Sequence, residues 1–179
     1  MRFFSGFSLE GEEVLFGEFL KSYKKNPYIV AGFSYGAIKA LEYVYRCEER
    51  VDRLLLLSPA YFVQKSEAFK KTQIIYFKKD PAKYLKSFFK NAAYPADSSL
   101  LDPFMKNGTL EELKELLEYE WPKDRLKSVA ERGVKIEIYL GMKDRVVDAQ
   151  EAHNFFKEYG QSYLFKPYGH ILKEGKIGG

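Results

Sequence analysis

The 179-residue sequence predicts one α/β domain, with about five parallel strands, helices on both faces and a helical insert. Short apolar runs alternate with stretches of helical spacing. The run RLLLLSPA (53–60) is typical of a strand buried on both faces of a parallel sheet. No convincing strand lies within 61–133. We therefore assign 1–60 and 134–179 to the core and 61–133 to a helical lid.

The first part of the core is expected to alternate strand, helix, strand, helix. The first helix is inferred from apolar residues at helical spacing, and Asn26-Pro27 ends it. These four elements are expected at 2–4, 12–23, 28–31 and 35–46.

The insert should consist of several helices. The capping box Thr109-x-x-Glu112 opens the clearest one, and Gly133 is well placed to end the last. A strand is then expected at 134–141, where alternating polar residues indicate one poorly covered face. A helix opened by Asp148 follows at about 149–159, and a last strand at 162–165. This order implies right-handed crossovers.

Composition places the chain among folded globular proteins. Hydrophobic residues make up 46% of it and charged residues 30%, which argues against disorder. The net charge of +4 is unevenly distributed, because residues 65–90 hold eight lysines against one Glu and one Asp. Such a run is usually a solvated helix face, but it can also receive an acidic macromolecule. We expect no nucleic-acid binding, since no recognised motif is present.

Cysteine and histidine usage limits other possibilities. Cys47 is the only cysteine, which favours a reducing compartment, and with two histidines it cannot form a structural zinc cluster. The N-terminus lacks a secretion pattern, and no apolar run reaches membrane-spanning length. We expect a cytoplasmic protein, a monomer, without metal, cofactor or membrane association.

Ser34 lies in the motif Gly32-Phe33-Ser34-Tyr35-Gly36, which has the form G-x-S-x-G. A β-run leads into the motif and a helix leads out, which is the context of a nucleophile held on a sharp turn. Gly32 and Gly36 allow strand and helix to approach closely. The alternative is an ordinary loop in which Ser34 caps the helix.

A serine nucleophile needs a base and an acid that orients it. His170 follows the last expected strand, so it belongs to the same sheet edge as Ser34, whereas His153 falls inside a helix. Asp144 follows the strand at 134–141, while Asp148 is better suited to opening the next helix. The order Ser34, Asp144, His170 matches that of one known fold class. The competing interpretation of His170 is a chance loop histidine.

The oxyanion of such a reaction needs backbone donors. Tyr35 offers its N–H at a helix N-terminus. We expect the second donor in Ser5-Gly6-Phe7, after the first strand, and assign it to the Phe7 N–H. A plain turn that uses Gly6 is the alternative.

These residues resemble the α/β-hydrolase superfamily over the whole chain, in a reduced form that lacks the leading hairpin and one further strand with its helix. Ser5-Gly6-Phe7 stands where the superfamily often has His-Gly-Phe or His-Gly-Trp. More narrowly, MRFFSGF, GFSYGAIKALEY, LLLLSPA, SEAFK, GTLEEL and GVKIEIYLGMKD resemble the short BioV-type pimeloyl-ACP methyl ester esterases of biotin synthesis.

The narrower resemblance implies demethylation of a pimeloyl chain carried on acyl carrier protein. That carrier is acidic, so lysines of the insert are candidate contacts: Lys65, Lys70, Lys71, Lys78 and Lys79. Aromatic residues of the insert are candidates for an acyl pocket, or else pack the lid onto the sheet: Phe62, Phe69 and Phe77.

Three other functions remain open on the sequence. A general short-chain carboxylesterase or thioesterase would use the same triad, as would a hydrolase of carbon–carbon bonds. A non-catalytic module that binds an acidic partner would not need the triad.

Overall fold

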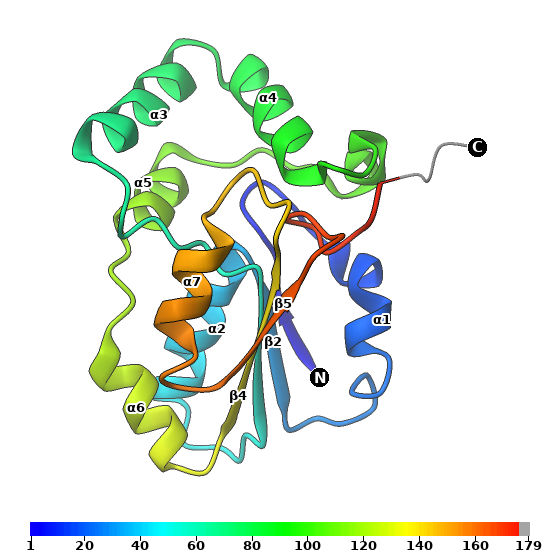
Figure 1. Ribbon diagram of the computed structural model, residues 1–179, viewed down its shortest axis with the longest axis vertical. Helices are drawn as coiled ribbons and strands as arrows, with labels where there is room; N and C mark the ends of the chain where they lie inside the picture. The colour runs from blue at the N-terminus through cyan, green and yellow to red at the C-terminus, as the bar shows by residue number, and fades with distance from the viewer. Residues whose placement is uncertain (176–179) are drawn as a thin grey trace.

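The computed structural model describes residues 1–175. Its centre is one parallel five-stranded sheet in which the strands follow their sequence order, β1-β2-β3-β4-β5. The strands are β1 (Arg2–Phe4), β2 (Ile29–Phe33), β3 (Arg53–Leu57), β4 (Lys135–Gly141) and β5 (Gln161–Phe165). Because all strands run in one direction, their carboxyl ends meet at one edge of the sheet (Figure 1). The predicted fold class, a reduced α/β-hydrolase fold, is confirmed.

Helices cover both faces of this sheet (Figure 1). One face carries α2 (Tyr35–Arg46), α6 (Lys123–Glu131) and α7 (Ala149–Phe156), and the other carries the 3-10 helix η1 (Glu12–Phe16) with the short helix α1 (Gly17–Leu20). Successive side chains of β3 alternate between two separate apolar clusters, Leu54 and Leu56 in one, Leu55 and Leu57 in the other. All four are fully buried, which is why this strand is apolar without interruption.

Three helices of the predicted insert lie across the carboxyl edge of the sheet and form the lid (Figure 1). They are α3 (Glu67–Lys79), α4 (Pro81–Ala93) and α5 (Leu110–Glu118), with two 3-10 turns, η2 (Ser98–Leu100) and η3 (Asp102–Phe104), between α4 and α5. The fourth helix, α6, instead lies beside α2 and buries Leu126 and Val129 in the core. The helical nature of 61–133 is therefore as predicted, while only 67–118 covers the site.

The capping signals read from the sequence are confirmed. Thr109 Oγ1 accepts the Glu112 N–H at 3.1 Å, and Glu112 Oε2 accepts the Thr109 N–H at 3.0 Å. Asp148 caps α7 through the Glu151 N–H at 3.0 Å. Gly133 has φ +83° just after α6, a conformation that glycine adopts without strain.

The single helix expected at 12–23 was wrong. Its residues form η1 and then the four-residue α1, with Gly17 at the junction. Glycine is a poor helix former and favours such a break. Val14 is 57% exposed, whereas Phe16 is buried, so the apolar residues of this stretch do not share one buried face.

The other strand and helix boundaries shifted by a few residues. The strand expected at 28–31 extends to Phe33 and so leads directly into Ser34, and β3 ends at Leu57, before Ser58-Pro59. The helix expected at 149–159 ends at Phe156. The strands expected at 134–141 and 162–165 are β4 and β5, which begin at Lys135 and Gln161.

The poorly covered face expected on β4 was also wrong. Glu137 is only 6% exposed, because it pairs with Arg53 on the neighbouring strand and accepts the Tyr139 hydroxyl at 2.6 Å. Glu137 and Tyr139 pair with each other instead of facing solvent, and Lys135 at the start of the strand is exposed.

Across residues 1–175 we find no helix with the length and apolar character needed to cross a bilayer.

Candidate active site

Ser34 stands at a tight turn between the last residue of β2 and the first of α2. Its backbone has φ 53° and ψ −114°, a strained conformation for a residue with a side chain. The flanking glycines are required by contact: a Cβ on Gly32 would lie 2.2 Å from the Gly36 carbonyl oxygen, and one on Gly36 would lie 2.0 Å from the Phe4 carbonyl oxygen. Strand, turn and helix are packed so closely that only glycine fits.

The Ser34 side chain does not cap α2. It makes no capping hydrogen bond, although it occupies the N-cap position. Its Oγ instead lies 2.9 Å from Nε2 of His170, within hydrogen-bond range. The capping alternative is therefore excluded by the geometry.

His170 and Asp144 complete a line of three side chains. Nδ1 of His170 lies 2.6 Å from Oδ2 of Asp144, and both side chains are almost fully buried. Asp144 is held in turn, because its Oδ1 accepts the N–H groups of Val146 at 2.7 Å and Val147 at 3.0 Å. The carboxylate therefore orients the imidazole so that Nε2 faces the serine.

The two proposed oxyanion donors lie beside this serine. Tyr35 is the first residue of α2, and Phe7 follows β1 in the loop that touches the elbow. A Cβ on Gly6 would lie 2.8 Å from the Phe33 ring, which shows how closely this loop packs on the elbow. Among the described residues, neither the Phe7 N–H nor the Tyr35 N–H donates a hydrogen bond. Both are therefore available to a ligand oxygen.

The competing candidates lie elsewhere. His153 is in α7, where its Nδ1 lies 2.9 Å from Oγ of Ser162 on β5. Asp148 is engaged as the cap of α7. Within residues 1–175, no three His, Cys, Asp or Glu side chains come together as a metal site would need.

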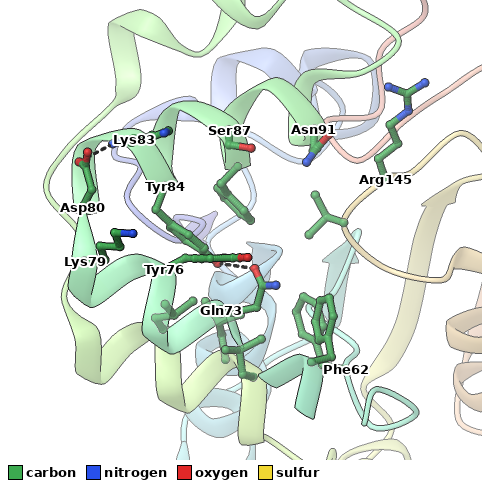
Figure 2. Close-up of a pocket in the computed structure, with 16 residues that line it drawn as sticks. Phe62, Gln73, Tyr76, Lys79, Asp80, Lys83, Tyr84, Ser87, Asn91 and Arg145 are labelled. Atoms are coloured by element: carbon green, nitrogen blue, oxygen red, sulfur yellow. Dashed lines mark hydrogen bonds between the residues drawn. The ribbon is translucent and has the colours of Figure 1, made fainter. Parts of the chain in front are cut away.

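A cavity of about 640 Å³ lies under the lid (Figure 2). Its walls come from α3, α4 and α5, and from Arg145 and Val146, the two residues after Asp144. Phe62 and Phe69, two of the candidate acyl-pocket residues, line it together with Phe88, Leu113, Leu116 and Leu117. Its volume and largely apolar wall suit a small organic ligand.

Phe77, the third ring assigned to the pocket, does not line the cavity. It is 6% exposed and packs against Phe7 and Tyr84, with ring centroids 6.1 and 5.5 Å apart. It belongs to the packing between lid and oxyanion loop. Arg145 and the leucines of α5 were missed as pocket residues, because helices distant in sequence build the wall together.

Polar groups stand around the cavity, among them Lys79, Asp80 and Lys83 at one end and Arg145 at another (Figure 2). The Arg145 guanidinium lies over the Tyr94 ring, 3.2 Å from its centroid. Asp80 caps α4 through the Lys83 N–H at 3.0 Å. The cavity wall is thus mostly apolar, with the polar side chains of Gln73, Ser87 and Asn91 and several cations also in its lining.

The lysines predicted to meet a partner differ in availability. Lys71, Lys78 and Lys79 are exposed on α3. Lys70 is mostly covered and lies 3.6 Å from Glu67, while Lys65 lies over the Phe69 ring at 5.5 Å. The first three present exposed positive charge on α3.

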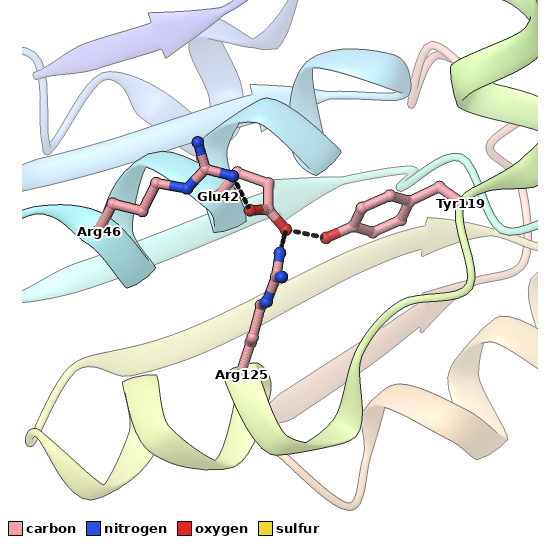
Figure 3. A network of polar contacts seen from close by, with 4 residues as sticks. All are labelled: Glu42, Arg46, Tyr119 and Arg125. Atoms are coloured by element: carbon pink, nitrogen blue, oxygen red, sulfur yellow. Dashed lines mark hydrogen bonds and ion pairs between the residues drawn. The ribbon is translucent and has the colours of Figure 1, made fainter.

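Polar contacts tie the lid to the helix that follows the nucleophile. The Tyr35 hydroxyl donates to Glu115 of α5, and both burial and this carboxylate raise the pKa of Tyr35 above its ordinary value. Farther along α2, Glu42 accepts the Tyr119 hydroxyl at 2.6 Å and pairs with Arg125 and Arg46 (Figure 3). The end of the lid is therefore anchored on α2.

The chain matches the family model of the serine aminopeptidases, S33, over residues 13–168. It belongs to this family. The match includes Ser34 and Asp144, and His170 lies two positions beyond its end. No curated protein sequence is significantly similar to the chain.

Solved structures share the fold. An esterase from Exiguobacterium antarcticum superposes with a TM-score of 0.66 at 22% identity, over 87% of this chain and 64% of that one. The carboxylesterase CesB from Bacillus subtilis superposes with a TM-score of 0.59 at 17% identity, over 92% of this chain and 61% of that one. An α/β hydrolase from a Medee basin deep-sea metagenome library superposes with a TM-score of 0.64 at 13% identity, over 94% of this chain and 81% of that one. The chain thus spans less than two thirds of the two esterases, and these identities establish the fold alone.

Proposed function

We propose that this protein is a carboxylic ester hydrolase in which Ser34 is the nucleophile, His170 the general base and Asp144 its orienting acid. The observation that carries the proposal is the continuous line of contacts from Asp144 Oδ2 through the His170 ring to Ser34 Oγ, at 2.6 and 2.9 Å. Serine hydroxyls are weak nucleophiles, and such a base is what activates them.

In the first step, Ser34 Oγ attacks the ester carbonyl carbon while its proton passes to Nε2 of His170. The N–H groups of Phe7 and Tyr35 stabilise the resulting oxyanion, and Asp144 stabilises the imidazolium. The tetrahedral intermediate collapses as the alkoxide leaves with the proton from His170. For a methyl ester the leaving group is methanol, and the acyl group stays on Ser34.

In the second step, water loses a proton to His170 and attacks the acyl carbon. The second tetrahedral intermediate releases Ser34, which regains the proton, and the carboxylic acid departs. The net reaction adds one water to the ester. Any acyl group that reaches Ser34 can follow this route, so the substrate depends on the cavity and on the surface beside it.

For the substrate we propose a methyl ester of pimeloyl chain length carried on acyl carrier protein, in the biotin pathway of the cytoplasm. The apolar cavity next to the Asp144 loop suits an acyl chain. Lys71, Lys78 and Lys79 present positive charge on the lid helix α3, complementary to an acidic carrier. The resemblance of the sequence to BioV-type esterases supports the same assignment.

A general short-chain carboxylesterase is the second candidate, favoured by the esterases and carboxylesterases among the structural neighbours. It would use the same three residues without a carrier. The two candidates differ in whether the lysines of α3 matter.

The deciding experiment compares two substrates: pimeloyl-ACP methyl ester and a short-chain p-nitrophenyl ester. Each is assayed with wild type and with Ser34→Ala, at about 50 and 300 mM salt, since screening weakens surface attraction. We expect strong preference for the carrier-bound ester, reduced at high salt, and loss of turnover by several orders of magnitude in Ser34→Ala. Turnover of the small ester alone would keep the hydrolase and reject the carrier. Full activity in Ser34→Ala would refute the triad.

A further inference from the structure

A buried carboxylate lies beside the loop that holds Phe7. Glu12, the first residue of η1, is fully buried, and its Oε1 accepts the Gly6 N–H at 2.7 Å. This distance is in the range of charge-assisted hydrogen bonds. Glu12 thus fixes the backbone N–H of Gly6, the residue before the proposed oxyanion donor Phe7.

Burying this carboxylate costs free energy, because it removes a charged group from water. Desolvation raises the pKa of Glu12 above its ordinary value, and polar interactions with the Gly6 N–H, its own backbone N–H and the Ser5 side chain offset part of that rise. Within the described chain, Oε2 has no hydrogen-bond partner. An apolar side chain would avoid this cost, so the carboxylate fits a role that requires an acceptor at this point.

Two hydrogen bonds hold the peptide planes on either side of Gly6. The Glu12 carboxylate holds the peptide plane between Ser5 and Gly6 by accepting the Gly6 N–H. The Leu9 N–H donates to the Gly6 carbonyl at 3.2 Å and holds the next plane. That second plane includes the Phe7 N–H, which points opposite to the Gly6 carbonyl because the peptide is planar and trans. The direction of the Phe7 N–H therefore depends on both anchors.

The loop also carries backbone strain that needs such anchors. Ser8, the residue after Phe7, has φ 57°. Glycine at position 6 gives the chain more conformational freedom than any other residue would. Without the Glu12 acceptor, only the Leu9 N–H would restrain the backbone at Gly6, and the direction of the Phe7 N–H would be less fixed.

We propose that Glu12 is a positioning residue of the oxyanion hole: by holding the Gly6 N–H, it aims the Phe7 N–H at the oxygen that becomes negative on the substrate. This inference rests on the proposed ester hydrolysis. Glu12 acts through Gly6, and among the described residues its carboxylate makes no hydrogen bond to Ser34 or His170.

The test compares Glu12→Ala and Glu12→Gln, with Glu10→Ala as a matched control on an exposed glutamate two residues earlier. Glutamine keeps an oxygen that can accept the Gly6 N–H, whereas alanine removes it. Three quantities are measured: kcat and KM on the best ester, the rate at which a fluorophosphonate labels Ser34, and hydrogen exchange of the Gly6 amide. Circular dichroism and urea unfolding report whether each variant is folded.

We expect Glu12→Ala to lower kcat by about 10- to 100-fold with KM changed less than about 3-fold, a smaller loss than removal of an oxyanion donor. Labelling of Ser34 should slow in parallel, and the Gly6 amide should exchange faster. Glu12→Gln should recover kcat to within about 5-fold of wild type, as expected if only the acceptor matters. Glu10→Ala should match wild type.

Unchanged kcat in a folded Glu12→Ala would overturn the inference. Equal losses in Ala and Gln variants, in step with a lower folded fraction, would overturn it too, by assigning Glu12 a purely structural role. If wild type is labelled at Ser34 but hydrolyses no ester, the proposed function fails, and the labelling rates of the variants still decide the role of Glu12. A wild type that is neither labelled nor active overturns both.

Discussion

At the carboxyl edge of the sheet, backbone contacts set the place of the residues of the site, whereas in the lid above it helices surround a cavity. Gly36 lies so near Phe4 that no side chain would fit, and Ser34 is strained in a turn between two regular elements. The lid encloses about 640 Å³ and exposes Ile75 and Tyr76 to 61% and 58%. The edge has one closely packed geometry, whereas the lid leaves a cavity large enough for a small organic ligand.

This contrast separates two kinds of substitution. Changes at the edge should act on the chemical step, because the oriented groups there matter in the transition state. Changes in the lid should act on which substrate is accepted and on the stability of the helices above the cavity.

The largest effect is expected at Asp144. Asp144→Asn should lower kcat by about 10³- to 10⁴-fold, because an amide no longer holds the imidazole in the tautomer that accepts the serine proton. The fold should be retained, since the Asn oxygen can still accept the Val146 N–H. Steady-state kinetics measure kcat, and circular dichroism reports whether the variant is folded. Asp148→Asn, a change in the cap of α7, should alter kcat less than about 2-fold; similar losses in the two variants would contradict the assignment.

A smaller effect, limited to one substrate, is expected from the lid surface. The triple change Lys71, Lys78 and Lys79 to Glu should lower kcat/KM for a carrier-bound ester by about 10-fold or more at low salt, because it reverses the charge that attracts an acidic carrier. The small ester should be hydrolysed within about 3-fold of the wild-type rate, a margin that allows for Lys79 in the cavity lining.

The matched control places the same charge change at the other end of the molecule. Lys21, Lys24 and Lys25 are exposed and precede β2, at the amino edge of the sheet. Their triple change to Glu should leave carrier-bound turnover within about 2-fold of wild type, since charges beyond the Debye length are screened. Equal losses from both triples would show that net charge, not the lid surface, attracts the carrier.

The smallest effect is expected in the alkaline stability of the lid. Burial raises the pKa of Tyr84 to about 12, above its ordinary value near 10. The folded state therefore keeps the proton while the unfolded chain loses it, and the free energy of unfolding should fall as pH rises from about 10 to 12. Tyr84→Phe should lessen this fall by at most about 2 kcal/mol.

Urea unfolding at pH 9 and pH 11.5 measures that difference. Tyr76→Phe is the control, because Tyr76 lines the same cavity but is 58% exposed. At pH 9, Tyr84→Phe also loses the hydrogen bond between the hydroxyl and Gln73, 3.1 Å long. For each variant we therefore compare the change in the free energy of unfolding between pH 9 and pH 11.5. The same pH dependence in wild type and Tyr84→Phe would show that Tyr84 titrates normally.

Much of the fold and of the candidate site could be predicted because the signals are local. An apolar run such as 54–57 can only be satisfied between two covered faces, and glycines around Ser34 mark a close turn. Parallel strands bring their carboxyl ends together, so residues that directly follow them, such as Asp144 and His170, meet at one edge.

The wrong predictions concern segments whose structure depends on residues distant in the sequence. The apolar spacing over 12–23 predicted one helix, but Glu12 turns inward to Gly6, and Gly17 interrupts the rest. The alternation in β4 predicted an uncovered face, but Arg53 on another strand pairs with Glu137. Neither partner is visible in the local pattern.

By itself, the sequence determined the parallel sheet, the elbow at Ser34 and the order of the three residues, because hydrophobic periodicity and turn chemistry act over a few positions. Only the tertiary structure decided the hydrogen bonds between those residues, the cavity under α3, α4 and α5, and the grip of Glu12 on Gly6. Each depends on distances between segments far apart along the chain, which packing sets and no local pattern encodes.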